Sequence, residues 1–102
     1  MTNVVVGNKR SGARGIYVGR PSPLGNPFFM HDESQRDACC DEYEQWLTAK
    51  IAAKDRAVCA ELNAIYQRAK SEQITLVCWC APRRCHADFI ARLINEKLEA
   101  RK

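Results

Sequence analysis

Residues 74–80 read ITLVCWC, an almost wholly apolar run that contains several β-branched residues. Such a run, closed by an alanine–proline pair at positions 81–82, predicts a β-strand that ends before the proline. A strand that is apolar on both faces is typical of the centre of a sheet covered by helices. This stretch therefore predicts an α/β domain built around one buried strand.

Two further strands are predicted nearer the N-terminus. Residues 3–7 (NVVVG) and 15–19 (GIYVG) are short runs of β-branched and aromatic residues bounded by glycine, which is a strand pattern. The link between them is basic and contains glycine. We therefore expect these two strands to form a loose hairpin.

Helices are predicted before and after the apolar strand, where apolar residues recur at helical spacing. Asp32 can cap the first helix with Gln35 as its capping-box partner, and Asp55 can cap a second. No glycine or proline separates these two helices, so one long kinked helix is the alternative. The last helix is expected to begin between Pro82 and Cys85.

The resulting order is β-β-α-α-β-α, with about three strands and three helices in a small two-layer or three-layer α/β domain. The chain has the length of one common domain, so residues 1–102 are expected to form a single unit. No apolar run approaches the roughly 20 residues of a membrane span, and no signal-peptide core is present at the start. We expect a cytoplasmic protein with no membrane partner, whose six cysteines are reduced, metal-bound or reactive.

The excess positive charge of the chain, +4, lies entirely within residues 1–30. This segment contains Lys9, Arg10, Arg14 and Arg20 and no acidic residue, whereas basic and acidic residues balance over residues 31–102. A local positive charge of this kind attracts the phosphates of a nucleotide or of a nucleic acid.

The segment CWCAPRRCH, residues 78–86, gathers groups that carry chemistry. Side chains two residues apart on a strand share a face, so Cys78 and Cys80 are expected to project together. Cys85 and His86 follow at or near the start of the last helix. All four are thus expected at the carboxyl end of a buried strand, where open α/β sheets usually bind ligands.

Three interpretations of these residues stay open. In one, Cys78, Cys80 and Cys85 bind zinc or an iron–sulfur cluster, although their spacing is not a standard one. In another, the cysteines pack as small apolar side chains and His86 caps the helix.

The remaining interpretation makes Cys85 a catalytic nucleophile. The positive end of the helix dipole and the neighbouring cations Arg83 and Arg84 would lower the pKa of its thiol. His86 and Asp88 are then candidates for acid–base catalysis, and the helix start is a candidate seat for an anion.

A second unusual segment, GRPSPLGNPF, spans residues 19–28 and contains three prolines and two glycines. Prolines at this density predict a stiff, extended loop that can hold a ligand-facing shape. We expect Gly19 and Gly25 to allow close approach of the backbone, Arg20 to hold a phosphate or carboxylate, and Asn26 to orient the ligand. We also expect this loop and the cysteine segment to face one pocket.

The other cysteines are expected to play a different part. Cys39, Cys40 and Cys59 lie on predicted helices, and two of them fall near apolar stripes. Packing in the core is the role that this pattern favours.

The two unusual segments together resemble the family known as domain of unknown function 4326, which occurs in bacterial and bacteriophage genomes. The resemblance spans about residues 16–96 and includes YVGRPSPLGNPF, the R-x6-Y-x2-WL pattern that begins at Arg36, and LVCWCAPRRCHADFIARLINE. One departure is Ala87, where the family usually has glycine before the aspartate. The resemblance implies no activity, because none is assigned to the family.

From these patterns we expect a pocket that binds or processes a nucleotide or a similar phosphorylated small molecule, in an enzyme or a sensor. The alternative is a binding module stabilised by zinc or an iron–sulfur cluster, whose basic first thirty residues contact nucleic acid. The sequence does not predict an oligomeric state.

Overall fold

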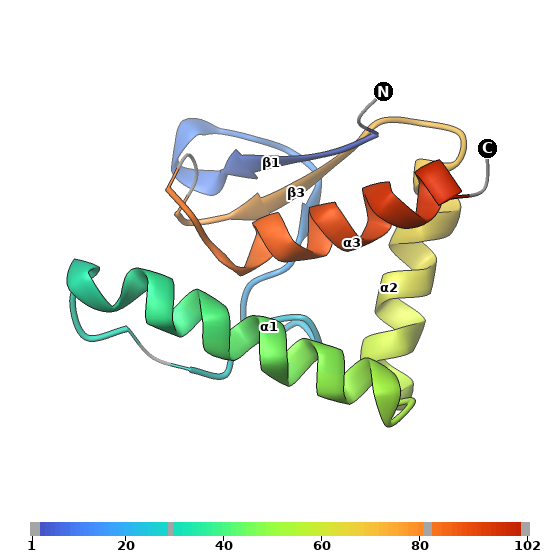
Figure 1. Cartoon of the computed structure of the whole chain (residues 1–102). Coiled ribbons are helices and arrows are strands. Elements are labelled where there is room, and N and C mark those ends of the chain that lie inside the picture. Colours follow the sequence, from blue (N-terminus) through green and yellow to red (C-terminus); the bar gives the residue numbers. More distant parts are fainter. Residues whose placement is uncertain (1–2, 29, 81–82, 101–102) are drawn as a thin grey trace.

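The apolar strand is β3 (Ile74–Cys78), and it lies between β1 (Val4–Asn8) and β2 (Ile16–Tyr17) in a three-stranded sheet (Figure 1). Both neighbours run parallel to β3. The computed structural model describes residues 3–28, 30–80 and 83–100. The central place of this strand confirms the prediction made from its apolar sequence.

The predicted hairpin between the first two strands is wrong. β1 and β2 do not pair with each other in the described sheet, because β3 lies between them. Parallel strands need a crossover instead of a tight turn, and residues 9–15 provide a short one. A Cβ on Gly7 would be 2.7 Å from the Cβ of Ala13, so this link passes closely over the sheet.

The link covers the face of the sheet that the helices leave uncovered. Successive residues of a strand lie on opposite faces of the sheet. Val4 and Leu76 lie on the face that packs against the core, and Gly7 lies on the opposite face. Val77 also points away from this core, yet it is 4% exposed. The sheet is therefore shielded on both sides, by helices on one and by a loop on the other.

Three helices supply the second layer: α1 (Arg36–Ala52), α2 (Arg56–Ala69) and α3 (His86–Ala100). The order of elements is β-β-α-α-β-α, as predicted. α3 packs along the sheet, and α1 and α2 lie farther from the sheet (Figure 1). The main core lies between the sheet and the helices. Its large fully buried side chains include Val4, Leu24, Tyr43, Leu47, Ile65, Leu76 and Ile90.

The helix boundaries confirm part of the capping analysis. Asp55 caps α2 by accepting a hydrogen bond of 3.1 Å from the backbone N–H of Val58. Lys54, directly before it, has a φ of 58°, which breaks the helix, so α1 and α2 are separate. Asp32 instead caps a short 3-10 turn at Glu33–Gln35, and α1 begins only after this turn.

The strand is shorter than predicted, because β3 ends at Cys78 and Trp79 and Cys80 form a bend. Residues 81 and 82, where the sequence predicts the strand to stop, lie outside the described residues. α3 begins at His86, one residue after the predicted interval from Pro82 to Cys85. No described helix is both long enough and apolar enough to cross a membrane.

Candidate functional site

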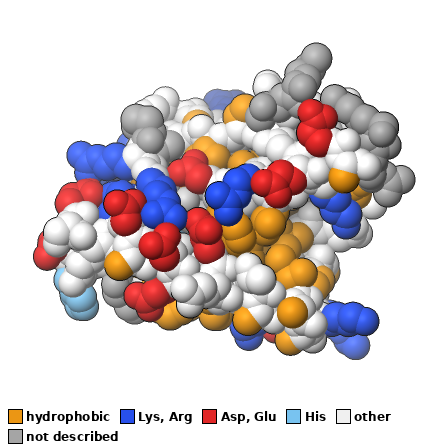
Figure 2. Space-filling view, in the orientation of Figure 1, with side chains coloured by type: hydrophobic (Ala, Val, Ile, Leu, Met, Phe, Trp, Pro, Cys, Tyr) orange, Lys and Arg blue, Asp and Glu red, His pale blue; other side chains and the backbone are white. Residues whose placement is uncertain are grey.

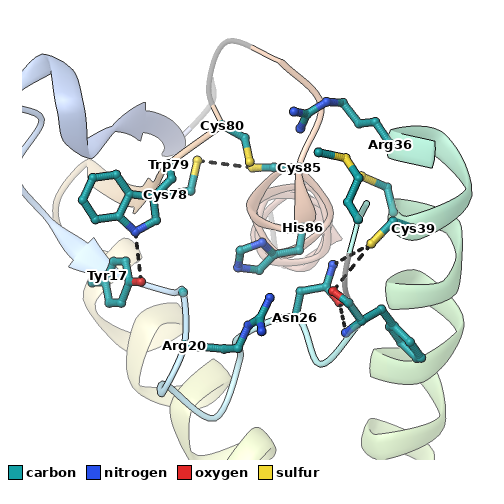
Figure 3. A pocket seen from close by; sticks show the side chains of 14 residues that line it. Tyr17, Arg20, Asn26, Arg36, Cys39, Cys78, Trp79, Cys80, Cys85 and His86 are labelled. Carbon is teal, nitrogen blue, oxygen red and sulfur yellow. Dashed lines mark hydrogen bonds between the residues drawn. The ribbon is translucent and has the colours of Figure 1, made fainter. Parts of the chain in front are cut away.

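A pocket of about 320 Å³ opens at the carboxyl end of β3 (Figure 3). The proline-rich loop lines one side of it and the cysteine segment lines the other, which confirms the predicted proximity of these two motifs. The lining residues are Tyr17, Gly19, Arg20, Asn26, Phe28, Met30, Arg36, Cys39, Cys40, Cys78, Trp79, Cys80, Cys85 and His86.

Thiols dominate the chemistry of this pocket. Five of the six cysteines line it, and none of the six forms a disulfide. Cys39 and Cys40 are buried, as the packing role requires, but their position on the pocket wall was not predicted. They lie on α1, which reaches the pocket only through tertiary packing, so no local motif marks them.

Cys78 and Cys85 form the closest pair. Their Sγ atoms are 3.3 Å apart, and the Cys85 thiol donates to the Cys78 sulfur (Figure 3). Both residues are almost completely buried. This hydrogen bond first, and burial second, raise the pKa of Cys85 well above its usual range. The prediction that Cys85 ionises easily is therefore wrong.

The two arginines before Cys85 do not supply the expected positive charge to its thiol. Arg83 forms an ion pair with Glu33, and Arg84 pairs with three carboxylates of α1 at 2.8–3.0 Å. Hydrogen bonds to these carboxylates raise the pKa of the Arg84 guanidinium. The three acids are Asp37, Asp41 and Glu44.

Arg36 is a cation at the thiol-lined wall of the pocket. Its guanidinium donates at 2.8 Å to the backbone carbonyl of Arg84 and pairs with Glu33 at 2.7 Å, and it interacts electrostatically with the Cys80 thiol. These contacts, that with Glu33 foremost, raise the pKa of Arg36. Arg36 was not predicted as a site residue, although it opens the R-x6-Y-x2-WL pattern.

His86 enters the pocket as a neutral imidazole. Its Nε2 lies 2.8 Å from the carbonyl oxygen of Val18, and because a carbonyl only accepts, Nε2 carries the proton. Burial lowers the pKa of His86, and the positive charge of Arg20 lowers it further. Nδ1 is then unprotonated and able to accept a proton.

This burial predicts a pH-dependent stability. The unfolded chain binds a proton at His86 near the ordinary pKa of 6.5, whereas the folded chain resists it. Stability should therefore fall as the pH drops below about 6.5, by at most about 1.4 kcal/mol per pH unit from this group. Urea unfolding of the wild type and His86→Gln between about pH 5 and pH 8 measures this. Parallel curves for the two proteins would contradict the assignment.

Asp88 serves the helix and not the pocket. Its carboxylate accepts a hydrogen bond of 3.0 Å from the backbone N–H of Cys85, and Asp88 is exposed outside the pocket lining. The N–H of Asp88 is also engaged, by the carbonyl oxygen of Cys85 at 3.1 Å. These bonds use groups that an anion seat at the helix start would need.

Some residues of the proline-rich loop lie at the pocket, and others stabilise the shape of the loop. Arg20 is exposed at the pocket and Gly19 lines it. Gly25 does not line the pocket; a Cβ there would be 2.9 Å from the backbone nitrogen of Arg20, so glycine allows the loop to fold on itself. Asn26 lines the pocket, but its Oδ1 accepts from the Phe28 N–H at 2.8 Å.

The amide nitrogen of Asn26 donates to the Cys39 sulfur at 3.6 Å. Its side chain therefore holds the loop against α1, a role that the sequence did not predict. The buried Tyr43 hydroxyl fastens the same loop by donating to the Leu24 carbonyl oxygen at 2.7 Å.

An aromatic wall forms the remaining side of the pocket. The Trp79 indole N–H donates to the Tyr17 hydroxyl at 3.2 Å, and Trp79 is 49% exposed. The Lys9 ammonium lies 5.0 Å from the centre of the Tyr17 ring and 5.8 Å from that of Trp79. Exposed aromatic faces beside a cation can stack a flat ring.

No group of three or more His, Cys, Asp or Glu side chains within residues 3–28, 30–80 and 83–100 is arranged to hold a metal ion. The bend at Trp79 and Cys80 accounts for part of this, because Cys80 no longer continues the strand that carries Cys78. The pair at 3.3 Å thus stands without a third ligand.

The parallel sheet, its one-sided helix layer and the thiol-lined pocket at the strand end define a small α/β pocket protein. Within this class, the chain belongs to the family described as Domain of unknown function (DUF4326), which it matches over residues 6–96. This match confirms the resemblance seen in the sequence. No match is found among curated proteins or among solved structures.

Proposed function

We propose that the pocket binds a nucleotide or a similar phosphorylated small molecule beside its hydrogen-bonded thiol pair. The observation that carries the proposal is one pocket lined by a cation, an aromatic wall and a hydrogen-bonded thiol pair. Its volume of about 320 Å³ falls within the range of small-molecule sites.

Each wall of the pocket suits one part of such a ligand. The faces of Tyr17 and Trp79 can stack a base, a contact worth about 1–3 kcal/mol. Arg20 offers a planar guanidinium for a phosphate, and Lys9 adds positive charge beside the rings. The helix start is not part of this phosphate site, because the Asp88 carboxylate and the Cys85 carbonyl oxygen engage its N–H groups.

The chemistry assigns different parts to the two thiols. Cys78 is the candidate nucleophile of the pair, because it accepts the hydrogen bond from Cys85 and such a bond stabilises a thiolate. Cys85 is the donor that holds this charge. His86, neutral and in the same pocket, is the candidate proton acceptor.

The proposed site needs reduced thiols, which places the protein in a reducing compartment such as the cytoplasm.

A charge substitution tests the proposed ligand class. Arg20→Ala should weaken the binding of nucleoside monophosphates about tenfold or more, because it removes a charge-assisted phosphate contact. Arg14→Ala is the matched control, since Arg14 is exposed outside the pocket lining. Calorimetric titration of a panel of nucleoside monophosphates measures both.

Nucleic acid binding gives a different pattern. Each substitution among Lys9, Arg10, Arg14 and Arg20 would then weaken oligonucleotide binding by a similar, modest factor. The salt dependence would fall by about one unit of slope for each phosphate contact removed. That result, with no effect specific to Arg20, would overturn the small-ligand proposal.

A further inference from the structure

A basic and aromatic surface adjoins the thiol pocket at the carboxyl end of β1. There β1 leads into a 3-10 turn at Lys9–Ser11, and the side-chain amide of Asn8 donates to the backbone carbonyl of Trp79 at 3.4 Å. This contact holds the turn beside Trp79, which lines the pocket and is nevertheless 49% exposed. The indole ring therefore extends from the pocket into solvent.

Exposed cations stand beside this indole ring. The Lys9 ammonium lies 5.8 Å from its centre, and Arg10 is the next residue of the turn. Both are exposed, as is Arg14 farther along the link. None of the three forms an ion pair with the residues that the structure describes. Their charge is therefore available to a ligand.

The positive charge on the helices, by contrast, is neutralised. Figure 2 shows acidic and basic side chains interspersed over α1 and α3, and the guanidinium groups of Arg84 and Arg92 pair with carboxylates of these helices. Residues 3–28 contain no acidic side chain. The excess positive charge thus lies at the pocket and on the adjoining link, residues 9–15.

These cations exceed what one mononucleotide needs. Arg20 already offers the proposed pocket a guanidinium for one phosphate. A pocket of about 320 Å³ is near the lower limit for small-molecule sites, so any further nucleotides must lie outside it. Proteins that bind single strands stack successive bases on aromatic rings and follow the backbone with cations. The exposed ring of Trp79, with Lys9 and Arg10 beside it, has this composition.

We propose that the protein binds single-stranded nucleic acid, with one nucleotide in the pocket and the next nucleotides across Trp79 and the turn at Lys9–Ser11. The proposal rests on the proposed nucleotide pocket and names its ligand as part of a strand. An unpaired strand fits better than a duplex, because a base in a duplex is stacked and paired and must leave the helix to enter a pocket.

Three ligands test the proposal by calorimetric titration: thymidine monophosphate, oligothymidylate and a stable DNA duplex. A strand of about eight thymidylates, a typical length for a single-strand site, should bind at least about tenfold more tightly than the monophosphate at low salt. The duplex should bind more weakly than the strand. Arg20→Ala should weaken the binding of both the monophosphate and the strand.

The substitution Arg10→Gln separates the surface from the pocket. It should weaken strand binding several-fold and reduce the salt dependence by about 0.7 units of slope, the value for one phosphate contact of a single strand. The affinity for thymidine monophosphate should stay unchanged, because Arg10 lies outside the pocket lining.

Arg56→Gln is the matched control for this substitution. It removes the same charge from an exposed position at the start of α2, far from β1 (Figure 1). The affinity and the salt dependence of strand binding should both stay unchanged.

Three results would overturn the proposal. They are a strand that binds no more tightly than the monophosphate, a duplex that binds as tightly as the strand, and equal effects of Arg10→Gln and Arg56→Gln. Each can occur while thymidine monophosphate still binds through Arg20, so the proposed pocket would stand. If the monophosphate does not bind, or binds Arg20→Ala equally well, the proposed function itself fails and this proposal fails with it.

Discussion

Replacement of Gly15 by alanine is expected to destabilise the protein by about 3 kcal/mol or more. Gly15 has a φ of 159° and lies against the central strand. A Cβ at this position would overlap sterically with the carbonyl oxygen of Thr75 and would lie 3.0 Å from its carbonyl carbon. Because these atoms belong to the backbone of β3, they cannot relieve the overlap by a change of rotamer, as a side chain could. Urea unfolding followed by circular dichroism measures the loss.

Gly12→Ala is the matched control for this substitution. Gly12 also has a positive φ, 82°, but no atom lies within 4 Å of a Cβ built there. It should cost only the conformational penalty of a left-handed residue, about 1–2 kcal/mol. Equal losses for the two variants would show that the close approach of residue 15 to β3 has no energetic weight.

Mild oxidation with diamide is expected to join Cys78 to Cys85. Their sulfurs are 3.3 Å apart, so the two thiols can lose two hydrogens to the azo bond of diamide and form a disulfide. The product should be lighter by two hydrogens, resist alkylation at both residues, and revert on treatment with dithiothreitol. Peptide mapping by mass spectrometry checks all three properties.

Two variants sharpen this experiment. Cys85→Ser should abolish the cross-link, and Cys59→Ser should leave it intact, because Cys59 lies outside the thiol pocket. In the reduced protein, joint protection of Cys78, Cys80 and Cys85 that a chelator removes would point to the metal-stabilised module instead. Rapid alkylation of Cys85 alone near neutral pH would contradict the raised pKa of its thiol.

Local chemistry made the main elements of the fold predictable. The apolar run at β3 identified the central strand, and Asp55 marked the start of α2. The sheet order was not predictable in the same way. β1 and β2 are short and both suit a hairpin, and only the position of β3 between them decides otherwise.

The candidate site was predictable to a similar depth. The two unusual segments were expected to share a pocket, and they do. The electrostatics of Cys85 were not predictable, because the acids that neutralise Arg84 come from α1, forty or more positions away in the sequence. Arg36, Cys39 and Cys40 reach the pocket on the same helix, so α1 accounts for most of what the sequence did not reveal.

The order of the strands also bears on how the chain folds during its synthesis. Val4 pairs with Ile74, and Ile16 pairs with Leu76, so every described strand pairing includes β3. When β1, β2, α1 and α2 have emerged from the ribosome, β3 has not, so β1 and β2 still lack the strand with which both of them form hydrogen bonds. Contacts so distant in sequence slow folding. β1 and β2 therefore stay unpaired until β3 has emerged, and the sheet forms late in the synthesis of the chain.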